Sequence, residues 1–305
     1  MSRPRKLSRC LPDLLAELVM ASGVGYLAGV YSASRWLTKP SPVRLQQTPG
    51  DYGLFFEDLS CDTADGERLA GWVVTPPRPH ATLVLFHGVR HNREQLLGRI
   101  VFFSRAGYRC LAFDHRAHGQ STGKRTTFGF HESRDVAAVL RIVHACWPEQ
   151  PCAALGLSMG AAALCYAAEW TCRLHALVLE SVYHDIYRAF VTRMAMYPPF
   201  VRNLDHAILW VTERRLGLRL AQLAPADYMA ALAPAPILLV TGADDPHATP
   251  LDTLRLYERC REPRDLLVIS DAGHNDVFER GGSLYSERVL AFLEKHVRNS
   301  GAVAA

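Results

Sequence analysis

The sequence predicts one α/β domain with an eight-stranded, mostly parallel sheet, which begins after a separate N-terminal segment. Three observations carry this prediction. The chain has 305 residues, of which 49% are hydrophobic and 21% charged, an ordinary composition for a protein that buries a large core. Beyond residue 50, short apolar runs alternate with longer helical patterns, which is typical of strand–helix units. A turn signal joins the first two runs and indicates a hairpin.

The N-terminal residues 1–50 are expected to form a hydrophobic segment and a linker. Residues 18–34 carry no charge and would reach about 26 Å as a helix, a marginal length for crossing a bilayer. The segment is interpreted as a membrane anchor, a signal peptide, or a helix packed on the domain, and Asp13 and Glu17 weigh against the first two. Membrane association through this segment is the prediction taken forward, with a cytoplasmic location otherwise.

The excess of positive over negative charge comes from the first nine residues of this segment. The formal net charge is +4 at pH 7, and this stretch contains four basic residues and no acidic one, namely Arg3, Arg5, Lys6 and Arg9. The rest of the chain is therefore neutral. Because a nucleic-acid-binding protein concentrates basic residues on one face, this distribution argues against a nucleic-acid partner.

The domain is expected over residues 51–300, and its sheet is read from eight runs. The hairpin strands, 54–61 and 68–74, should be antiparallel because the turn sequence at 64–67 joins them. Strands buried on both faces of a parallel sheet are almost continuously apolar. Six further runs have that character: 82–86, 109–113, 152–157, 176–180, 237–241 and 266–270.

The alternation stops between the strands at 176–180 and 237–241. A helical cap is expected there, at about 183–233, since an insertion of this size more often covers a site than forms another domain. A run of methionine and aromatic residues lies between 194 and 210. It is interpreted either as the core of the cap or as the lining of an acyl-chain pocket.

The sharpest local signal is the sequence Gly-Leu-Ser-Met-Gly centred on Ser158, which follows an apolar run and precedes an alanine-rich helical run. A strand that turns abruptly into a helix strains the backbone of the central serine and leaves room only for small residues beside it. The turn lifts the hydroxyl into the open, and the helix N-terminus favours negative charge nearby. Ser158 is therefore the candidate nucleophile.

A serine nucleophile needs a base and an acid that orients the base. Among thirteen histidines, His274 is favoured as the base because it opens a glycine-containing loop after the last strand, and His247 is its rival. The acid should follow the preceding strand, where two carboxylates are adjacent. Asp245 is preferred there over Asp244.

Two backbone amides are expected to stabilise a developing oxyanion and so to contact the substrate. One is the amide of Met159, directly after the nucleophile, and the other is the amide of Val89, in the loop after the first parallel strand. His87 in that loop is interpreted as a structural brace rather than a second base.

No metal site is expected. His115 and His118 form a pair without a third ligand nearby in the sequence, so a structural role is favoured over metal binding. The eight cysteines include no pair with zinc-ligand spacing, and they are interpreted as core residues, with disulfides as the alternative.

The order Ser158, Asp245, His274 resembles the α/β-hydrolase superfamily over roughly residues 53–296. Within it, four motifs are similar to those of serine acyl hydrolases of the lysophospholipase-like, acyl-thioesterase-like and depalmitoylase-like kind: His-Gly at 87–88, Asp-His-Arg-Ala-His-Gly-Gln-Ser at 114–121, the serine turn at 156–160, and Gly-His-Asn-Asp at 273–276. The resemblance implies an α/β-hydrolase fold with a helical cap and an acyl-enzyme on Ser158. His274 would then be the base and Asp245 its orienting acid, with no metal or organic cofactor.

The leading hypothesis is therefore a serine hydrolase that cleaves a carboxylic ester or thioester of a small-molecule or lipid acyl substrate. The lipophilic part of this hypothesis rests on the apolar cap and the N-terminal segment. The alternatives are a serine peptidase of the same fold and a non-catalytic binding protein that has kept the fold.

Overall fold

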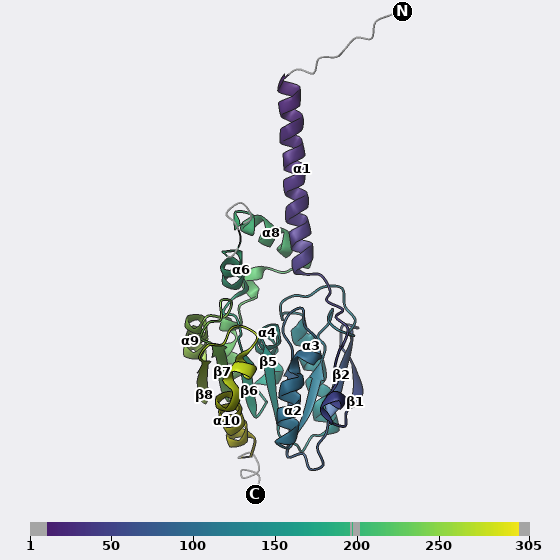
Figure 1. Cartoon of the computed structure of the whole chain (residues 1–305), viewed down its shortest axis with the longest axis vertical. Coiled ribbons are helices and arrows are strands. Elements are labelled where there is room, and N and C mark those ends of the chain that lie inside the picture. The colour runs from purple at the N-terminus through teal and green to yellow at the C-terminus, as the bar shows by residue number, and fades with distance from the viewer. Residues whose placement is uncertain (1–10, 196, 198–201, 299–305) are drawn as a thin grey trace, which may run out of the picture.

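The computed structural model describes residues 11–195, 197 and 202–298, and of residues 11–22 and 298 it describes only the backbone. One eight-stranded sheet has the strand order β1-β2-β4-β3-β5-β6-β7-β8 (Figure 1). The hairpin strand β2 is antiparallel to both of its neighbours, and all other pairs are parallel, which confirms the predicted fold class. The strands are β1 (Glu57–Asp62), β2 (Arg68–Val74), β3 (Ala81–Phe86), β4 (Tyr108–Phe113), β5 (Cys152–Leu157), β6 (Ala176–Glu180), β7 (Ile237–Gly242) and β8 (Arg264–Ile269).

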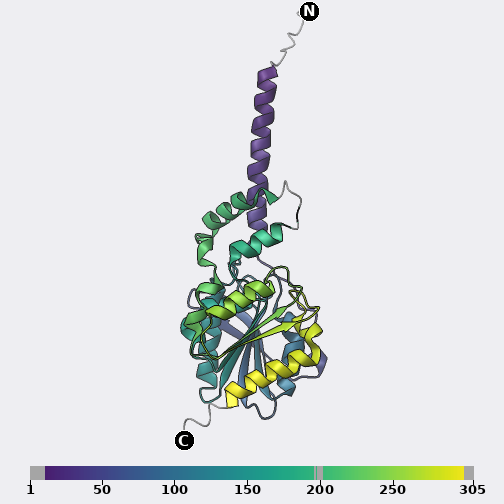
Figure 2. The ribbon, with the colours of Figure 1, turned by 90° about the vertical axis from the view of Figure 1, so that its left-hand side faces the viewer.

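Helices cover both faces of the sheet, and α1, α6 and α8 stand above the end of the sheet that is uppermost in Figure 2. The α-helices are α1 (Leu11–Leu37), α2 (Leu97–Arg105), α3 (Glu132–Cys146), α4 (Met159–Tyr166), α5 (Ala168–Thr171), α6 (Ile186–Met194), α8 (Asp205–Leu216), α9 (Pro250–Arg259) and α10 (Val277–Arg298). Short 3₁₀ turns complete the described chain: η1 (Pro49–Tyr52), η2 (Arg93–Leu96), η3 (Leu220–Gln222), η4 (Pro225–Asp227) and η5 (Met229–Leu232).

The apolar character of the inner strands follows from their burial on both faces. Every residue of β3, β4, β6 and β7 is buried. The edge strand β1 is mostly exposed, and it begins at Glu57 rather than at the predicted residue 54. Leu54 and Phe56 are partly buried against the core, so their apolar character reflects packing outside the strand.

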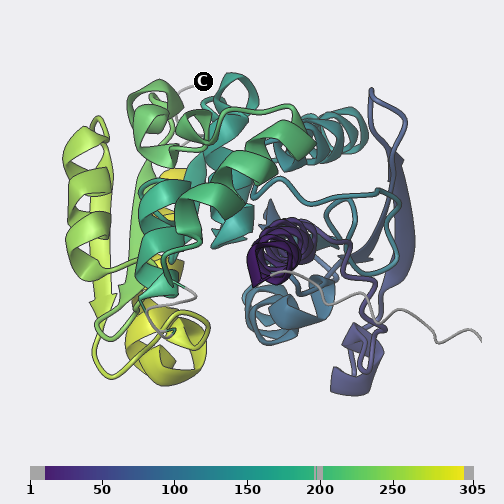
Figure 3. The same cartoon turned by 90° about the horizontal axis from the view of Figure 1, so that it is seen from above.

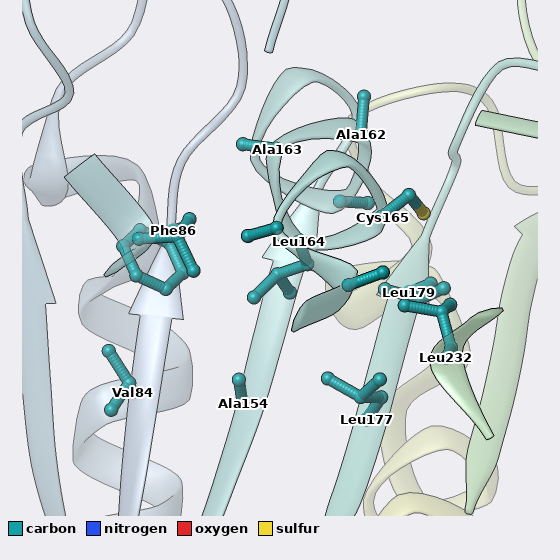
Figure 4. Packing of buried hydrophobic residues seen from close by; sticks show 14 of the residues in the cluster. Val84, Phe86, Ala154, Ala162, Ala163, Leu164, Cys165, Leu177, Leu179 and Leu232 are labelled. Carbon is teal, nitrogen blue, oxygen red and sulfur yellow. The ribbon is translucent and has the colours of Figure 1, made fainter. Parts of the chain in front are cut away.

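The core has two parts, one on each face of the sheet. Helices α3, α4 and α9 cover one face, where alanines of α4 allow the helix to lie close to Phe86 and Leu177 (Figure 4). Helices α2 and α10 cover the other face, with Phe103 and Tyr285 fully buried. The seven cysteines that the structure describes are free thiols, whereas Cys10 lies outside the described residues.

A buried ion pair ties α2 and α10 to the end of β6. The Arg99 guanidinium donates to both carboxylate oxygens of Glu180, at 2.6 and 3.2 Å, and the Tyr285 hydroxyl donates to the same carboxylate. The backbone oxygen of Glu180 in turn accepts a hydrogen bond from the amide of Ser158, at 2.8 Å. This network fixes the strand end against which the serine turn is built.

Helix α1 leaves the domain as a long rod, seen nearly end-on in Figure 3. Its last turns pack on α6 and α8, where Val30 is buried with Met194 and Ile208. Arg215 of α8 donates to the Ser34 and Thr38 hydroxyls at 3.0 and 3.1 Å. The packed-helix interpretation therefore describes the end of this segment, whereas residues 23–29 are exposed and the side chains of residues 18–22 lie outside the described residues.

Within the part of the chain whose side chains are described, no helix combines the length and the apolar character needed to span a membrane. The predicted anchor at residues 18–34 stays a prediction.

The segment predicted as a cap contains α6 and α8, which lie over the carboxyl ends of the strands (Figure 2). Met194 is buried in the contact with α1, as expected of cap core. Trp210 is 57% exposed, so it is not part of the core of the cap. Residues 196 and 198–201 of the predicted methionine and aromatic run lie outside the described residues.

Candidate active site

The structure brings the three predicted residues together at the carboxyl ends of the parallel strands. Ser158 follows β5, Asp245 follows β7 and His274 follows β8. The Ser158 Oγ lies 2.9 Å from Nε2 of His274. The Nδ1 of His274 lies 2.8 and 3.0 Å from the two carboxylate oxygens of Asp245. In the tautomer that fits these contacts, the imidazole donates from Nδ1 and accepts the serine proton at Nε2.

The turn that carries Ser158 has the strained backbone expected of its sequence. Ser158 has φ of 49° and ψ of −106°, a region that residues with a side chain rarely adopt. A Cβ atom on Gly156 would lie 2.5 Å from the Ala161 nitrogen, and one on Gly160 would lie 2.4 Å from the Phe86 oxygen. The two glycines are thus required by close contacts, and the turn leaves the Ser158 hydroxyl facing His274.

Asp245, and not Asp244, is the carboxylate that contacts the imidazole. Its side chain is buried, and its Oδ1 also accepts from the amides of His247 and Ala248 at 2.8 and 2.9 Å. Burial alone would raise the pKa of Asp245, but the hydrogen bond and charge of His274 together with these amides lower the pKa below its ordinary value. The carboxylate is therefore ionised at neutral pH, whereas Asp244 is exposed to solvent.

His247, the rival base, lies beside the triad rather than within it. Its ring packs edge-on against that of His274, with ring centroids 5.2 Å apart. Burial, followed by the charges of His274 and Arg193, lowers the pKa of His247. A neutral imidazole at this position forms part of the wall around the reacting groups.

The loop after β3 lies against the nucleophile. A Cβ atom on Gly88 would lie 3.7 Å from the Ser158 Cβ, and the Gly88 amide donates to the Gln95 side chain at 2.8 Å. Val89 and Met159, the predicted sources of the oxyanion-binding amides, both line the cavity above Ser158.

His87 braces this loop. Its Nδ1 lies 2.7 Å from the Gly88 oxygen, and its Nε2 accepts from the His115 amide at 3.0 Å. These contacts require one donor and one acceptor and so define a neutral ring. Burial lowers the pKa of His87 well below its ordinary value, in agreement with that assignment.

The motif at 114–121 positions the same loop from the other side. Asp114 accepts from the Arg93 amide at 2.7 Å and pairs with the Arg93 guanidinium. Arg116 pairs with Asp135 and Asp65 and is nearly buried. His115 and His118 pack around His87. Among the described residues, no group of three histidine, cysteine or carboxylate side chains is arranged to hold a metal.

A cavity of about 290 Å³ opens onto Ser158 and His274. Its wall comes from the loop after β3, from the cap helices and from the last turn of α1. Most of that wall is apolar and includes Trp36, Leu37, Phe128, Ile186, Phe190 and Leu209. The combination of a few convergent polar groups and an apolar wall is typical of a small-molecule binding site.

Two pairs of residues that line this cavity are not predicted from the sequence. Trp36 and Leu37 belong to a helix that the sequence places before the domain, and no local pattern shows that its end reaches the site. Arg90 and Arg193 also line the cavity. The positive φ of Arg90, 65°, marks a special backbone position, but the sequence around it contains no glycine-like signal at that residue.

The fold and the hydrogen-bonded Ser–His–Asp arrangement are those described for serine hydrolases of the α/β type. Comparison with known proteins agrees. Residues 77–216 match the family described as serine aminopeptidase, S33. The uncharacterized protein YqkD of Bacillus subtilis is 28% identical over 237 residues, which cover 76% of this chain and 77% of that protein.

Solved structures show the same fold. An esterase of Pyrococcus furiosus superposes with a TM-score of 0.72 at 24% identity, covering 85% of this chain and 98% of the esterase. The α/β hydrolase GrgF of a Penicillium species superposes with a TM-score of 0.63 at 20% identity, covering 80% of this chain and all of that one. The chain thus has the fold of the α/β hydrolases, and its residues 77–216 are similar to a serine aminopeptidase family.

Proposed function

We propose that this protein is a serine hydrolase that cleaves a carboxylic ester or thioester of a lipophilic acyl substrate. The observation that carries the proposal is the apolar cavity that opens onto the hydrogen-bonded Ser158 and His274. An apolar wall accommodates an acyl chain, and the serine lies where the carbonyl at the end of that chain would arrive.

In the proposed mechanism the Ser158 Oγ attacks the acyl carbonyl while Nε2 of His274 takes the serine proton. The amides of Val89 and Met159 stabilise the negative charge on the carbonyl oxygen. His274 then gives its proton to the departing alcohol or thiol, which leaves an acyl-enzyme. His274 then deprotonates a water that attacks the acyl-enzyme, and it returns this proton to the Ser158 Oγ as the acyl–Oγ bond breaks and the carboxylic acid leaves. Asp245 orients the imidazole throughout and stays ionised.

A peptidase that removes amino-terminal residues is the second candidate, because the matched family carries that description. Such an enzyme needs a carboxylate to bind the substrate ammonium group. The described residues of the cavity wall include no aspartate or glutamate. This absence favours the ester or thioester substrate.

The first test is labelling by a fluorophosphonate, followed by kcat/KM for p-nitrophenyl esters from acetate to palmitate. We expect labelling and a preference for medium chains over palmitate. The cavity lies at the lower end of the usual range for ligand pockets, about 300–1,000 Å³, and its wall is apolar. If the folded protein is not labelled and hydrolyses none of these esters, the mechanism is wrong and a binding role becomes the better hypothesis.

We also propose that α1 associates with a lipid bilayer. The support is the set of exposed apolar side chains on the free part of the helix, with Val24 and Leu27 67% and 65% exposed, and the four basic residues of the sequence before it. Replacing both Val24 and Leu27 by lysine should release the protein from vesicles of anionic and zwitterionic lipids in a flotation assay. The matched control, Leu254→Lys on the exposed side of α9, should still float. Equal flotation of all variants would exclude this surface.

A further inference from the structure

The charged side chains that line the cavity have one sign. Arg90 and Arg193 contribute guanidinium groups, and the described wall contains no carboxylate. Asp245, the nearest acidic residue of the triad, is 3% exposed and is bonded to His274 and to two amides. Within the described part of the chain, neither guanidinium has an anionic partner.

Arg90 is held in place next to the oxyanion-binding loop. It follows Val89 and has a φ of 65°, a conformation that costs free energy for any residue with a side chain. Its guanidinium stacks 3.5 Å above the centre of the Trp36 ring and donates to the Trp36 oxygen at 3.1 Å. Because a guanidinium has five N–H donors, several of them remain for a ligand.

Arg193 reaches the same space from the last turn of α6. Arg90 and Arg193 both line the cavity, and burial, followed by the charge of Arg193, lowers the pKa of Arg90. The charge of Arg193 also acts on His247, whose ring packs against His274. Arg193 thus lines the same cavity as Arg90, Ser158 and His274.

We propose that the substrate carries an anionic group, a carboxylate or a phosphate, that binds to Arg90 and Arg193 while its acyl carbonyl meets Ser158. This inference rests on the proposed function and names its substrate class. Planar guanidinium groups bind both anions through paired hydrogen bonds. The anion would also remove the repulsion between the two arginines. It can belong either to the alcohol part of the ester or to the far end of the acyl chain.

The test uses esters of one acyl length with a nitrophenol as the leaving group. In the first pair, the octanoate ester of a hydroxynitrobenzoate is compared with the octanoate ester of the corresponding neutral amide. In the second pair, the mono-nitrophenyl ester of an eight-carbon diacid is compared with its terminal amide. We expect the anionic member of one pair to have the higher kcat/KM, and the pair that shows the preference identifies which part of the substrate carries the charge.

Arg193→Gln should reduce this anionic preference about tenfold, as expected for the loss of one charged hydrogen-bonding group. The matched control is Arg188→Gln, in the same helix but paired with Asp252 at 3.5 Å, and it should keep the preference of the natural chain. Added salt should weaken the preference in the natural chain. If neither anion is preferred, or if Arg193→Gln lowers kcat/KM equally for charged and neutral esters, the inference is wrong.

The two proposals fail in different ways. Hydrolysis of neutral esters without an anionic preference would overturn the anion site and leave the hydrolase mechanism standing. If no ester is hydrolysed, calorimetry can still measure binding at the proposed anion site, with the Ser158→Ala variant as the protein. Octanoate should bind to this variant more tightly than octanamide. The difference in affinity should disappear in the double variant Ser158→Ala, Arg193→Gln. Equal binding of octanoate and octanamide would overturn the anion site by itself.

Discussion

Ser158→Ala is expected to lower kcat about a millionfold and to abolish fluorophosphonate labelling, as the loss of a serine nucleophile does in other triads. The variant removes only the Oγ that lies 2.9 Å from His274. It keeps the Cβ atom and with it the strained backbone of the turn. Its melting temperature should therefore stay close to that of the natural chain.

The variant Ser158→Gly distinguishes the loss of the nucleophile from the release of backbone strain in the turn. Glycine adopts the φ of 49° without steric cost, so this variant should be equally inactive but more stable than Ser158→Ala. A net gain of about 1 kcal/mol would raise the melting temperature by about 2–4 °C in a domain of this size. Equal melting temperatures for the two variants would show that the turn stores no strain.

Asp245→Asn is expected to lower kcat by about four orders of magnitude, because an amide does not hold the imidazole in the tautomer that accepts the serine proton. The neighbouring Asp244→Asn is the matched control and should change kcat only a few-fold, since Asp244 is exposed and outside the triad. A large loss in Asp244→Asn with little effect of Asp245→Asn would reverse the assignment.

The Asp245 carboxylate should also make the stability of the fold decrease as the pH falls. Against the effect of burial, the hydrogen bond to His274 lowers the pKa of Asp245, so ionised Asp245 stabilises the fold above the ordinary aspartate pKa of about 3.9. That contribution is lost as the pH falls through the lowered value. The natural chain should therefore be more stable than Asp245→Asn at neutral pH, and the difference should shrink below about pH 4 in denaturant titrations.

Much of the fold is predictable from the sequence because the patterns that indicate it lie within short stretches of the chain. The buried strands are continuous apolar runs, and the serine turn is specified by small residues around Ser158 whose spacing leaves few alternatives. Ser158, Asp245 and His274 each follow a strand-like run, which places them after the ends of β5, β7 and β8. The structure brings these three together as the sequence suggested.

What the sequence does not predict depends on contacts between distant segments. Arg99 and Glu180 are far apart in the chain, and nothing local shows that they meet beneath the serine turn. The position of Arg193 depends on how α6 crosses the strand ends, and that of Trp36 depends on how α1 ends against the cap. Periodicity describes which face of a helix is buried but not which neighbour buries it.

The end of helix α1 forms part of the wall of the candidate active site. The 27 residues of the helix make a rod of about 40 Å, and its last turns are fastened to α8 by Arg215 and to the loop after β3 by Arg90, which stacks on Trp36. The same helix end therefore contacts the cap, the residue after Val89 and the cavity that opens onto Ser158. A change in the orientation of α1 relative to the domain would displace Trp36 and Arg90, and with them part of the wall of that cavity.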